Sequence, residues 1–200
     1  MTYYSADRKF TDTVHNEVAL KEIYPQLGWK VFPMNPDELN RIDLEQGIDY
    51  VMIDRQGKKH NVQERFREYH YHFYKDATLR YRRDHSDDAD QIESEFYKIK
   101  ADYLVYGIIN GSKAQVRNRA KEFSFVKYAV IDLKVLFKQI GKRKIILDEK
   151  IGKPEIINGV MHAAVNENTD YSSNFVAFDV KGLNDLFGRE NIILIQEGFY

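Results

Sequence analysis

The sequence predicts an α/β protein with a mixed central sheet and helices packed on it. Three observations support this class: a helical spacing of apolar residues near the start, two short apolar runs separated by turn residues, and a further helix followed by an apolar strand. Helix, strand, hairpin, helix and strand in this order place the strands in one sheet and leave the helices to cover it.

Length and composition set the first limits. The chain has 200 residues, 43% hydrophobic and 30% charged, as expected for a single domain over residues 1–200. It contains no cysteine, which excludes disulfides, thiolate metal sites and a cysteine nucleophile. The N-terminus is polar, and no stretch approaches the roughly 18 apolar residues that a membrane span needs. We therefore expect a cytoplasmic protein with no membrane partner.

The first predicted elements are a long helix and a short strand. Thr11–Leu27 is predicted as a helix because apolar residues recur at helical spacing, namely Phe10, Val14, Leu20, Tyr24 and Leu27. Gly28 suits the left-handed position after a helix. A strand over Trp29–Phe32 follows, and Pro33 and Pro36 then interrupt any regular pattern.

Two strands and a turn form the predicted hairpin. Ile48–Ile53 is its first strand, Lys59–Phe66 its second, and Arg55–Lys58 the turn between them. Ala77–Arg82 then alternates apolar and polar residues, which predicts a strand with one polar face. A loop over Asp84–Asp90 comes next.

The later elements follow the same reasoning. A helix through Phe96 and Ile99 precedes Tyr103–Ile109, a mostly apolar strand that we expect at the centre of the sheet. Four further strands are expected, over Val126–Val130, Lys144–Asp148, Phe175–Val180 and Ile192–Gln196. Two further helices are expected, one through Leu133, Leu136 and Phe137 and one over Gly182–Phe187. The connections include a basic segment over Asn110–Lys121 and a polar loop over Asn166–Asn174.

Asp49 is the first candidate for chemistry. It opens a strand whose other residues are apolar, and a carboxylate there is unfavourable unless it is hydrogen-bonded or binds a metal ion. The structural alternative is an acid that accepts backbone N–H groups at a strand end, and it is about equally well supported.

Gln63 and Arg65 are the second candidates. Strand alternation places them on one face of their strand and Glu64 on the other. If this strand pairs with the strand of Asp49, then Asp49 and Gln63 converge, and their oxygens suit Mg²⁺. A neighbouring cation such as Arg65 would stabilise developing phosphate charge.

Glu17 is the third candidate. On a helical wheel it falls inside the apolar stripe, and a carboxylate on the core-facing side requires a partner or a metal-bound water. The alternative, which we favour for Glu17 taken alone, is an ion pair with a buried Lys or Arg.

Together these residues resemble the pattern of the PD-(D/E)XK nuclease superfamily. That pattern has an acid on the first helix, an Asp opening one strand and an acid-x-Lys on the next; the matching residues are Glu17, Asp49, Gln63 and Arg65. The resemblance covers residues 11–109 and leaves residues 110–200 as a C-terminal elaboration. It implies a restriction-endonuclease-like fold with an αβββαβ core.

The resemblance also implies an activity. It implies a divalent-metal-dependent DNA endonuclease, in the narrower reading a type II restriction endonuclease, with Mg²⁺ or Mn²⁺ as cofactor. Glu17, Asp49 and Gln63 would hold the metal, directly or through water, and Arg65 would neutralise the phosphate. A homodimer is expected, since cutting both strands of a duplex suits two sites related by a twofold axis.

Two departures from the pattern keep a second function open. Gln63 stands where an acid is usual, although its amide oxygen still ligates. Arg65 stands where Lys is usual, and arginine stays protonated and does not act as a base. The alternative is a catalytically impaired nuclease-like fold that serves as a nucleic-acid-binding or assembly module.

A basic segment follows the candidate site. Residues 55–83 hold nine Lys or Arg against three Asp or Glu, although the whole chain has a net charge of -1. We expect DNA phosphates to contact this segment through Arg67, Lys75, Arg80, Arg82 and Arg83, with Thr78, Arg80 and Arg82 as a DNA-facing strip. The alternative is a solvated face of the sheet.

Other classes of function lose support. The sequence has no Walker loop, no Gly-x-Gly-x-x-Gly and no Gly-x-Ser-x-Gly, which disfavours kinases, dehydrogenases and serine hydrolases. His60, His70 and His72 form a loose cluster in which His70 and His72 would share a strand face, and we interpret them as surface histidines rather than a metal site.

Overall fold

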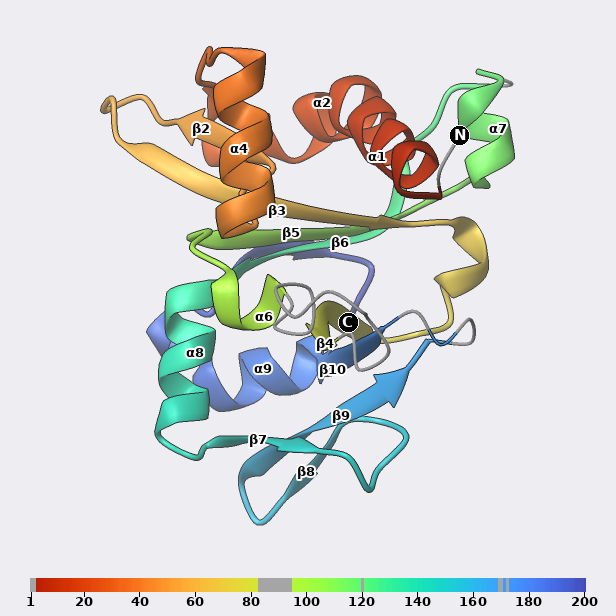
Figure 1. Cartoon of the computed structure of the whole chain (residues 1–200). Helices are drawn as coiled ribbons and strands as arrows, with labels where there is room; N and C mark the ends of the chain where they lie inside the picture. Colours follow the sequence, from red (N-terminus) through yellow and green to blue (C-terminus); the bar gives the residue numbers. More distant parts are fainter. Residues whose placement is uncertain (1–2, 83–94, 120, 169–170, 172) are drawn as a thin grey trace.

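The computed structural model describes residues 3–82, 95–119, 121–168, 171 and 173–200. Within them, two β-sheets are stacked with helices between and above them (Figure 1). The mixed α/β class predicted from the sequence is confirmed. Arg83 and the predicted loop over Asp84–Asp90 lie outside the described residues.

The first sheet is mixed and has six strands. The predicted hairpin is confirmed, because β2 and β3 pair antiparallel with Tyr50 opposite Val62. The next strand, β5, runs parallel to β3, and the remaining pairs are antiparallel. The order across the sheet is β1 (Lys30–Val31), β2 (Tyr50–Ile53), β3 (Lys59–Arg67), β5 (Tyr103–Ile109), β6 (Phe125–Asp132) and β11 (Ile193–Glu197).

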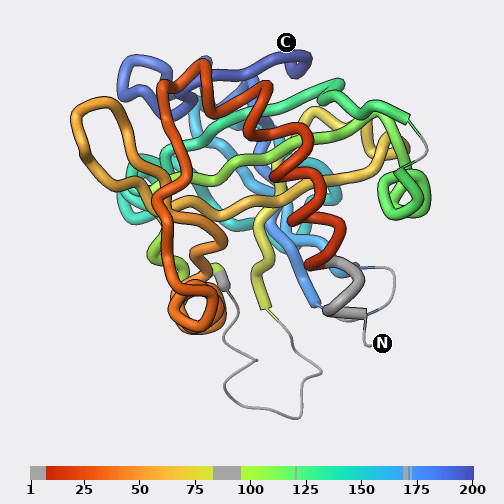
Figure 2. Tube along the Cα trace, turned by 90° about the horizontal axis from the view of Figure 1, so that it is seen from above, coloured from red at the N-terminus to blue at the C-terminus, as the bar shows by residue number. Residues whose placement is uncertain are grey.

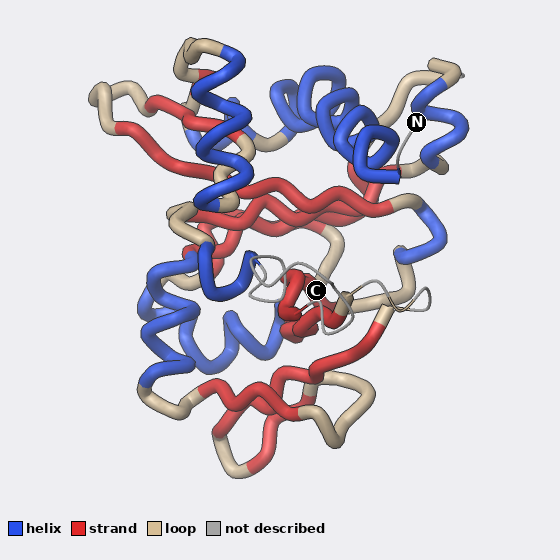
Figure 3. Tube along the Cα trace, in the orientation of Figure 1, coloured by secondary structure: helices blue, strands red, loops and turns tan. Residues whose placement is uncertain are grey.

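The second sheet contains the strand that follows the hairpin in the sequence. The strand predicted over Ala77–Arg82 is observed, but it pairs with β10, about a hundred residues further along the chain, and not with the first sheet. Figure 3 shows the two sheets as separate layers. The members are β4 (Asp76–Arg82), β10 (Asn174–Asp179), β9 (Val160–Glu167) and β7 (Ile145–Asp148), with β8 (Glu155–Ile157) paired to β9.

The N-terminal helical segment crosses one face of the first sheet (Figure 2). It starts at Tyr3, earlier than predicted, and ends at Gly28, whose φ of 68° confirms the expected left-handed cap. A five-residue π-helical turn interrupts it. Its parts are α1 (Tyr3–Val14), the π-helical turn His15–Ala19, α2 (Leu20–Glu22) and α3 (Tyr24–Leu27).

A helix forms where the sequence suggests only an interruption. Pro36 is the first residue of α4 (Pro36–Gln46), a position at which proline loses no helical hydrogen bond and its fixed φ is already helical. The side chain of Asn35 accepts a hydrogen bond from the amide of Asp37 at 2.9 Å and caps the helix. The sequence analysis was wrong to treat Pro36 only as an interruption.

The two faces of the first sheet carry separate cores. On the α1 side, Val62 and Phe66 of β3 pack with Val14 and Val18. On the other side, Leu104 and other residues of β5 face the second sheet. That space also holds α6 (Glu95–Lys98), α8 (Leu133–Gly141) and α9 (Val180–Phe187), whereas α7 (Lys113–Arg117) lies beside α1 (Figure 1).

None of the described helices has both the length and the apolar character required to cross a bilayer.

The cap of α4 generates the first prediction. Replacing Asn35 with Ala leaves the amide of Asp37 without its side-chain acceptor, so the free energy of unfolding should fall by about 1 kcal/mol. Asn35→Asp keeps an acceptor oxygen and should stay within a few tenths of wild type. Urea unfolding followed by circular dichroism measures both; equal loss in the two variants would contradict the capping role.

Candidate functional site

Asp49 lies directly before β2, against the middle of β3. Its backbone N–H donates to the carbonyl of Val62 at 2.9 Å. Its carboxylate oxygen Oδ2 accepts the backbone N–H of Glu64 at 2.7 Å. Asp49 is therefore hydrogen-bonded to β3 through both its backbone and its side chain, directly before Tyr50, the first residue of β2 that pairs with β3. This hydrogen bond is the one that the structural alternative for Asp49 requires, and it does not depend on a metal ion.

An arginine from α1 joins the same carboxylate to two others. The Nη1 of Arg8 lies 3.2 Å from Oδ1 of Asp49 and also contacts Asp43 of α4. The Nε of Arg8 lies 3.1 Å from Oδ1 of Asp12, one helical turn further along α1. Three acids from two helices and a strand end therefore share one guanidinium, which brings α1, α4 and β2 together at a single point.

The groups around Asp49 change its pKa in opposite directions. Burial raises the pKa of Asp49 well above its usual value, and the carboxylates of Asp43 and Glu64 raise it further. The Glu64 amide and Arg8 lower it, but they do not compensate. Any cation that binds at this carboxylate therefore competes with a proton.

Glu64 is the most deeply buried acid of the site. Its side chain is 0% exposed, and its Oε1 lies 2.8 Å from Nδ1 of His15. The hydroxyl of Tyr24 donates to the same oxygen. Among the described residues, the second oxygen, Oε2, has no hydrogen-bond partner. Burial and the nearby Glu64 raise the pKa of Tyr24 well above its usual value, so Tyr24 stays a hydrogen-bond donor.

Stacking of two rings joins Glu64 to the acids at the surface. The imidazole of His15 lies flat on the ring of Tyr50, with centroids 3.5 Å apart and planes at 5°. The Tyr50 hydroxyl donates to Oδ1 of Asp12 at 2.9 Å, and burial raises the pKa of Tyr50. A continuous polar network therefore runs from Glu64 through His15, Tyr50 and Asp12 to Arg8. It is most deeply buried at Glu64.

The sequence analysis missed His15, and it placed Glu17 wrongly. Glu17 is not on the core-facing side: its side chain is 37% exposed and lies 3.4 Å from Nε of Arg119. Glu17 therefore has an arginine partner, but Arg119 is exposed and is not the buried partner that the favoured alternative required. The cause is the π-helical turn, whose extra residue per turn shifts the apolar stripe and puts His15 inside.

Gln63 and Arg65 occupy the opposite face of β3 from Glu64, as strand alternation predicts. They lie beside Leu104 and Tyr106 in the parallel register with β5, on the face toward the second sheet. Continuing the β2–β3 register by one residue sets Asp49 beside Gln63. The neighbouring strands are therefore as expected, and the convergence of the two side chains on one metal stays a prediction.

The predicted DNA-facing strip on β4 is partly buried. Thr78 is only 5% exposed and accepts a hydrogen bond from Arg67 at 3.4 Å, because this face of β4 points toward β3. Arg67 also lies over the ring of Tyr71. Arg82 is paired with Glu149 of the loop after β7 at 3.0 Å. Lys75 is exposed, so the predicted basic residues do not all lie on one open face.

The histidine cluster is also different from the prediction. His60 is buried, stacked on Trp29 at 4.4 Å, and its Nε2 lies 3.0 Å from Asp54. His70 and His72 lie in and directly after a 3₁₀ turn over Tyr69–Tyr71 and not on a strand. The expectation of surface histidines is therefore wrong for His60.

The donor chemistry around Asp49 is that of a hard-cation site, since it consists of carboxylate oxygens. Among the described residues, no group of three or more His, Asp or Glu side chains is arranged to hold a metal ion. In this arrangement a guanidinium provides the positive charge between Asp49 and Asp43. Metal binding at Asp49 would therefore involve Gln63 or a displacement of Arg8.

Comparison with known proteins identifies no relative. No family model matches the chain, no curated protein matches it, and no solved structure matches it.

The burial of Glu64 generates a stability prediction. Glu64→Ala leaves His15 and Tyr24 without their shared acceptor and should lower the free energy of unfolding by roughly 3–5 kcal/mol. Glu64→Gln keeps an acceptor oxygen and should lose clearly less. Urea unfolding at neutral pH gives both values. An alanine variant as stable as the glutamine variant would show that the network does not hold α1 on the sheet.

The raised pKa of Asp49 generates a pH prediction. Folded Asp49 keeps its proton at pH values where the unfolded chain, near 3.8, has released it. The folded state is therefore progressively disfavoured as pH rises from that value through the raised pKa. Asp49→Asn should remove this part of the fall in stability with pH.

Asp54 provides a control of opposite sign. The hydrogen bond with His60 lowers the pKa of Asp54, so its contribution to stability is present above the usual carboxyl value and is lost as pH falls through the lowered pKa. Asp54→Asn should therefore lose stability chiefly at neutral pH. Thermal midpoints measured across the acidic and neutral range compare the three proteins, and identical pH profiles for Asp49→Asn and wild type would contradict the shift.

Proposed function

We propose that this protein is a divalent-metal-dependent DNA endonuclease whose centre lies between Asp49 and the Gln63–Arg65 face of β3. The observation that carries the proposal is the position of Asp49: it opens β2 with its carboxylate against the peptide of β3, one residue beyond the Tyr50–Val62 pair. The half-buried carboxylate is accompanied by two further acids, Asp43 and Asp12, which favours a cation there.

The arrangement of the first sheet supports a restriction-endonuclease-like core. A long helical segment is followed by β1, by α4, by the antiparallel pair β2 and β3, and then by β4, α6 and β5, which runs parallel to β3. With α4 as an insertion and β4 in the second sheet, this order is compatible with the αβββαβ core that the resemblance implies. The candidate residues lie where β2 begins and along the middle of β3.

Asp49, Gln63 and Arg65 would each have a separate role at such a site. Asp49 would ligate Mg²⁺ or Mn²⁺ with a full negative charge, and the amide oxygen of Gln63 would add a neutral ligand. The metal supplies an acidified water and neutralises phosphate charge. Arg65, always protonated, would hold the phosphate and not take a proton. Two copies related by a twofold axis would cut both DNA strands.

A second function is favoured by one contact. Arg8 already pairs with Asp49 and Asp43, so the cluster has a cation without a metal ion. With Gln63 and Arg65 in place of the usual acid and lysine, this supports a nuclease-like fold that binds nucleic acid or assembles with other molecules without cutting. Metal-dependent cleavage of plasmid DNA separates the two functions.

The catalytic prediction concerns Asp49. Asp49→Ala should abolish Mg²⁺-dependent cleavage of plasmid DNA, because the site loses the carboxylate that would ligate the metal beside Gln63. Glu45→Gln, at an exposed acid of the nearby α4, is the matched control and should cleave as wild type does. Cleavage rate and thermal midpoint are measured on the same preparations. Loss of stability with unchanged cleavage per folded molecule would reduce Asp49 to a strand cap.

Two further variants test the departures from the pattern. Gln63→Glu adds a negative charge and should tighten Mn²⁺ binding measured by calorimetry, whereas Arg65→Lys should keep or raise the cleavage rate. If the wild-type protein cleaves no duplex, single-stranded or RNA substrate with either metal, the nuclease proposal fails and the binding module takes its place.

A further inference from the structure

The connection between β3 and β4 is a run of six aromatic side chains, several of which are exposed to solvent. Its sequence, Tyr69-His-Tyr-His-Phe-Tyr74, forms a 3₁₀ turn and a short loop. Phe73 is 78% exposed, and Tyr69 and Tyr74 are about half exposed. Tyr69 stacks on His72 within the loop, with centroids 4.3 Å apart and planes at 10°, so its ring is held in place rather than loose. Exposed, oriented aromatic rings of this kind mark binding sites.

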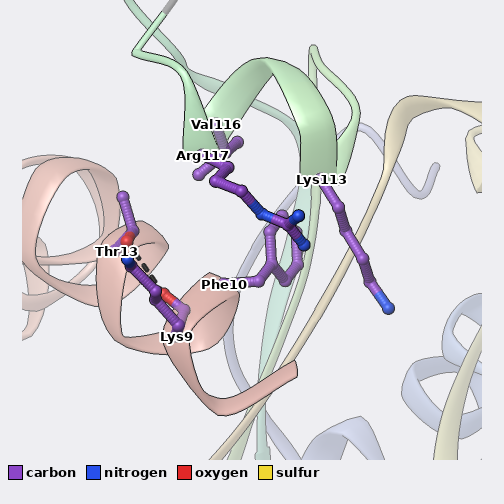
Figure 4. A pocket seen from close by; sticks show the side chains of 6 residues that line it. All are labelled: Lys9, Phe10, Thr13, Lys113, Val116 and Arg117. Atoms are coloured by element: carbon purple, nitrogen blue, oxygen red, sulfur yellow. Dashed lines mark hydrogen bonds between the residues drawn. The ribbon is translucent and has the colours of Figure 1, made fainter. Parts of the chain in front are cut away.

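Three cations surround a shallow depression beside this loop. Lys9 comes from α1 and Lys113 and Arg117 from α7, and Phe10 with Val116 forms the floor (Figure 4). Lys9 and Arg117 are exposed, and Lys113 is half-buried with its ammonium 5.8 Å from the centre of the Phe10 ring. Asp12 and Glu17 of the same helical segment are directed to Arg8 and Arg119, and Glu68 accepts the backbone amide of Lys113. Three basic side chains therefore line the depression.

The aromatic loop and the cationic depression are joined by two hydrogen bonds, one between backbone groups and one from a backbone amide to a side chain. The amide of Tyr69 donates to the carbonyl of Gly111 at 2.9 Å. The amide of Lys113, the first residue of α7, donates to Oε1 of Glu68 at 2.6 Å. Figures 1 and 2 both place this loop next to α7. Rings and cations thus belong to one continuous surface.

A further pair of cations lies on the far side of the loop. Lys127 of β6 donates to the carbonyl of Tyr74 at 3.0 Å. Burial and the neighbouring charge of Lys75 lower the pKa of Lys127, which places the two ammonium groups near each other. Asp76 partly offsets them. The exposed rings are therefore flanked by positive charge on both sides.

We propose that this surface binds a single-stranded segment of nucleic acid, with bases stacked on Tyr69, Phe73 and Tyr74 and phosphates at Lys9, Lys113 and Arg117. Exposed rings beside a basic surface fit splayed bases and a phosphate backbone, since every base offers an aromatic face. A regular duplex keeps those faces inside its own stack, so it would use the cations alone. The inference rests on the proposed function and narrows its substrate to nucleic acid with an unpaired stretch.

The test measures binding in EDTA, so that no cleavage takes part. Fluorescence anisotropy with a labelled oligo-dT, a matched abasic strand without bases, a matched RNA and a duplex gives four dissociation constants. Wild type should bind oligo-dT more tightly than the duplex or the abasic strand, with affinity falling steeply as salt rises. Comparison of oligo-dT with the RNA strand shows whether the surface prefers DNA or RNA, since both offer bases and phosphates.

Variants separate the two halves of the surface. Phe73→Ala should weaken oligo-dT binding by about 10-fold or more while leaving the abasic strand unchanged, because it removes only stacking. Phe73→Trp should retain binding. The double variant Lys113→Gln/Arg117→Gln should weaken both strands alike. Tyr171→Ala and Lys150→Gln, at the second sheet and far from this surface in sequence, are the matched controls for ring and charge.

The outcomes distinguish this inference from the nuclease proposal. Unchanged oligo-dT binding by Phe73→Ala, equal or tighter binding of the duplex by wild type, or no binding of any strand at low salt would overturn the inference; the last result would leave a protein partner as the occupant of the rings. Selective oligo-dT binding without cleavage in Mg²⁺ or Mn²⁺ would support the surface and overturn the nuclease. Cleavage that is lost in Asp49→Ala together with unaltered binding by Phe73→Ala would do the reverse.

Discussion

The buried carboxylate of Glu64 is the constraint on which the first sheet and its helix depend. It sits in the middle of the sheet with no exposed surface, and it is tolerated because His15 and Tyr24, from one helical segment, both reach the same oxygen. These contacts fix how that segment lies across β3. Because Arg8 belongs to the same helical segment, the position of the segment brings Arg8 into contact with Asp49 and Asp43. The buried network therefore determines the geometry of the acid cluster at the surface.

The elements that the sequence predicts well are those with a local signal. The left-handed glycine after the first helix, the β2–β3 hairpin and the apolar strand β5 all follow from nearby residues. The strand Asp76–Arg82 was recognised, but its partner was not, because β10 lies far along the chain and alternation alone does not reveal which sheet a strand joins. Pro36 was misread because proline marks a helix start as readily as an end.

The candidate site was predicted in part for the same reason. Asp49 and the parity of Gln63 and Arg65 follow from strand alternation, and they stand in the structure as expected. The prediction that Glu17 faces the core was wrong because it assumed a regular helix with 3.6 residues per turn. The π-helical turn moves His15 instead into the stripe of residues that faces the core. The cluster of three acids around Arg8 was not predicted from the sequence, because the acids come from separate elements. The cationic depression between α1 and α7 was missed likewise.

The position of β11 has a consequence for how the chain acquires its structure. The strand Ile193–Glu197 closes the edge of the first sheet against β6, and β10 of the same C-terminal region holds β4. Each sheet therefore depends on pairing between strands that are far apart in the sequence. Such pairing slows folding, because the entropy of the intervening chain is lost before the contacts form. During synthesis on the ribosome, the β2–β3 hairpin can form early, whereas the second sheet is complete only after β10 has emerged and the first only after β11 has.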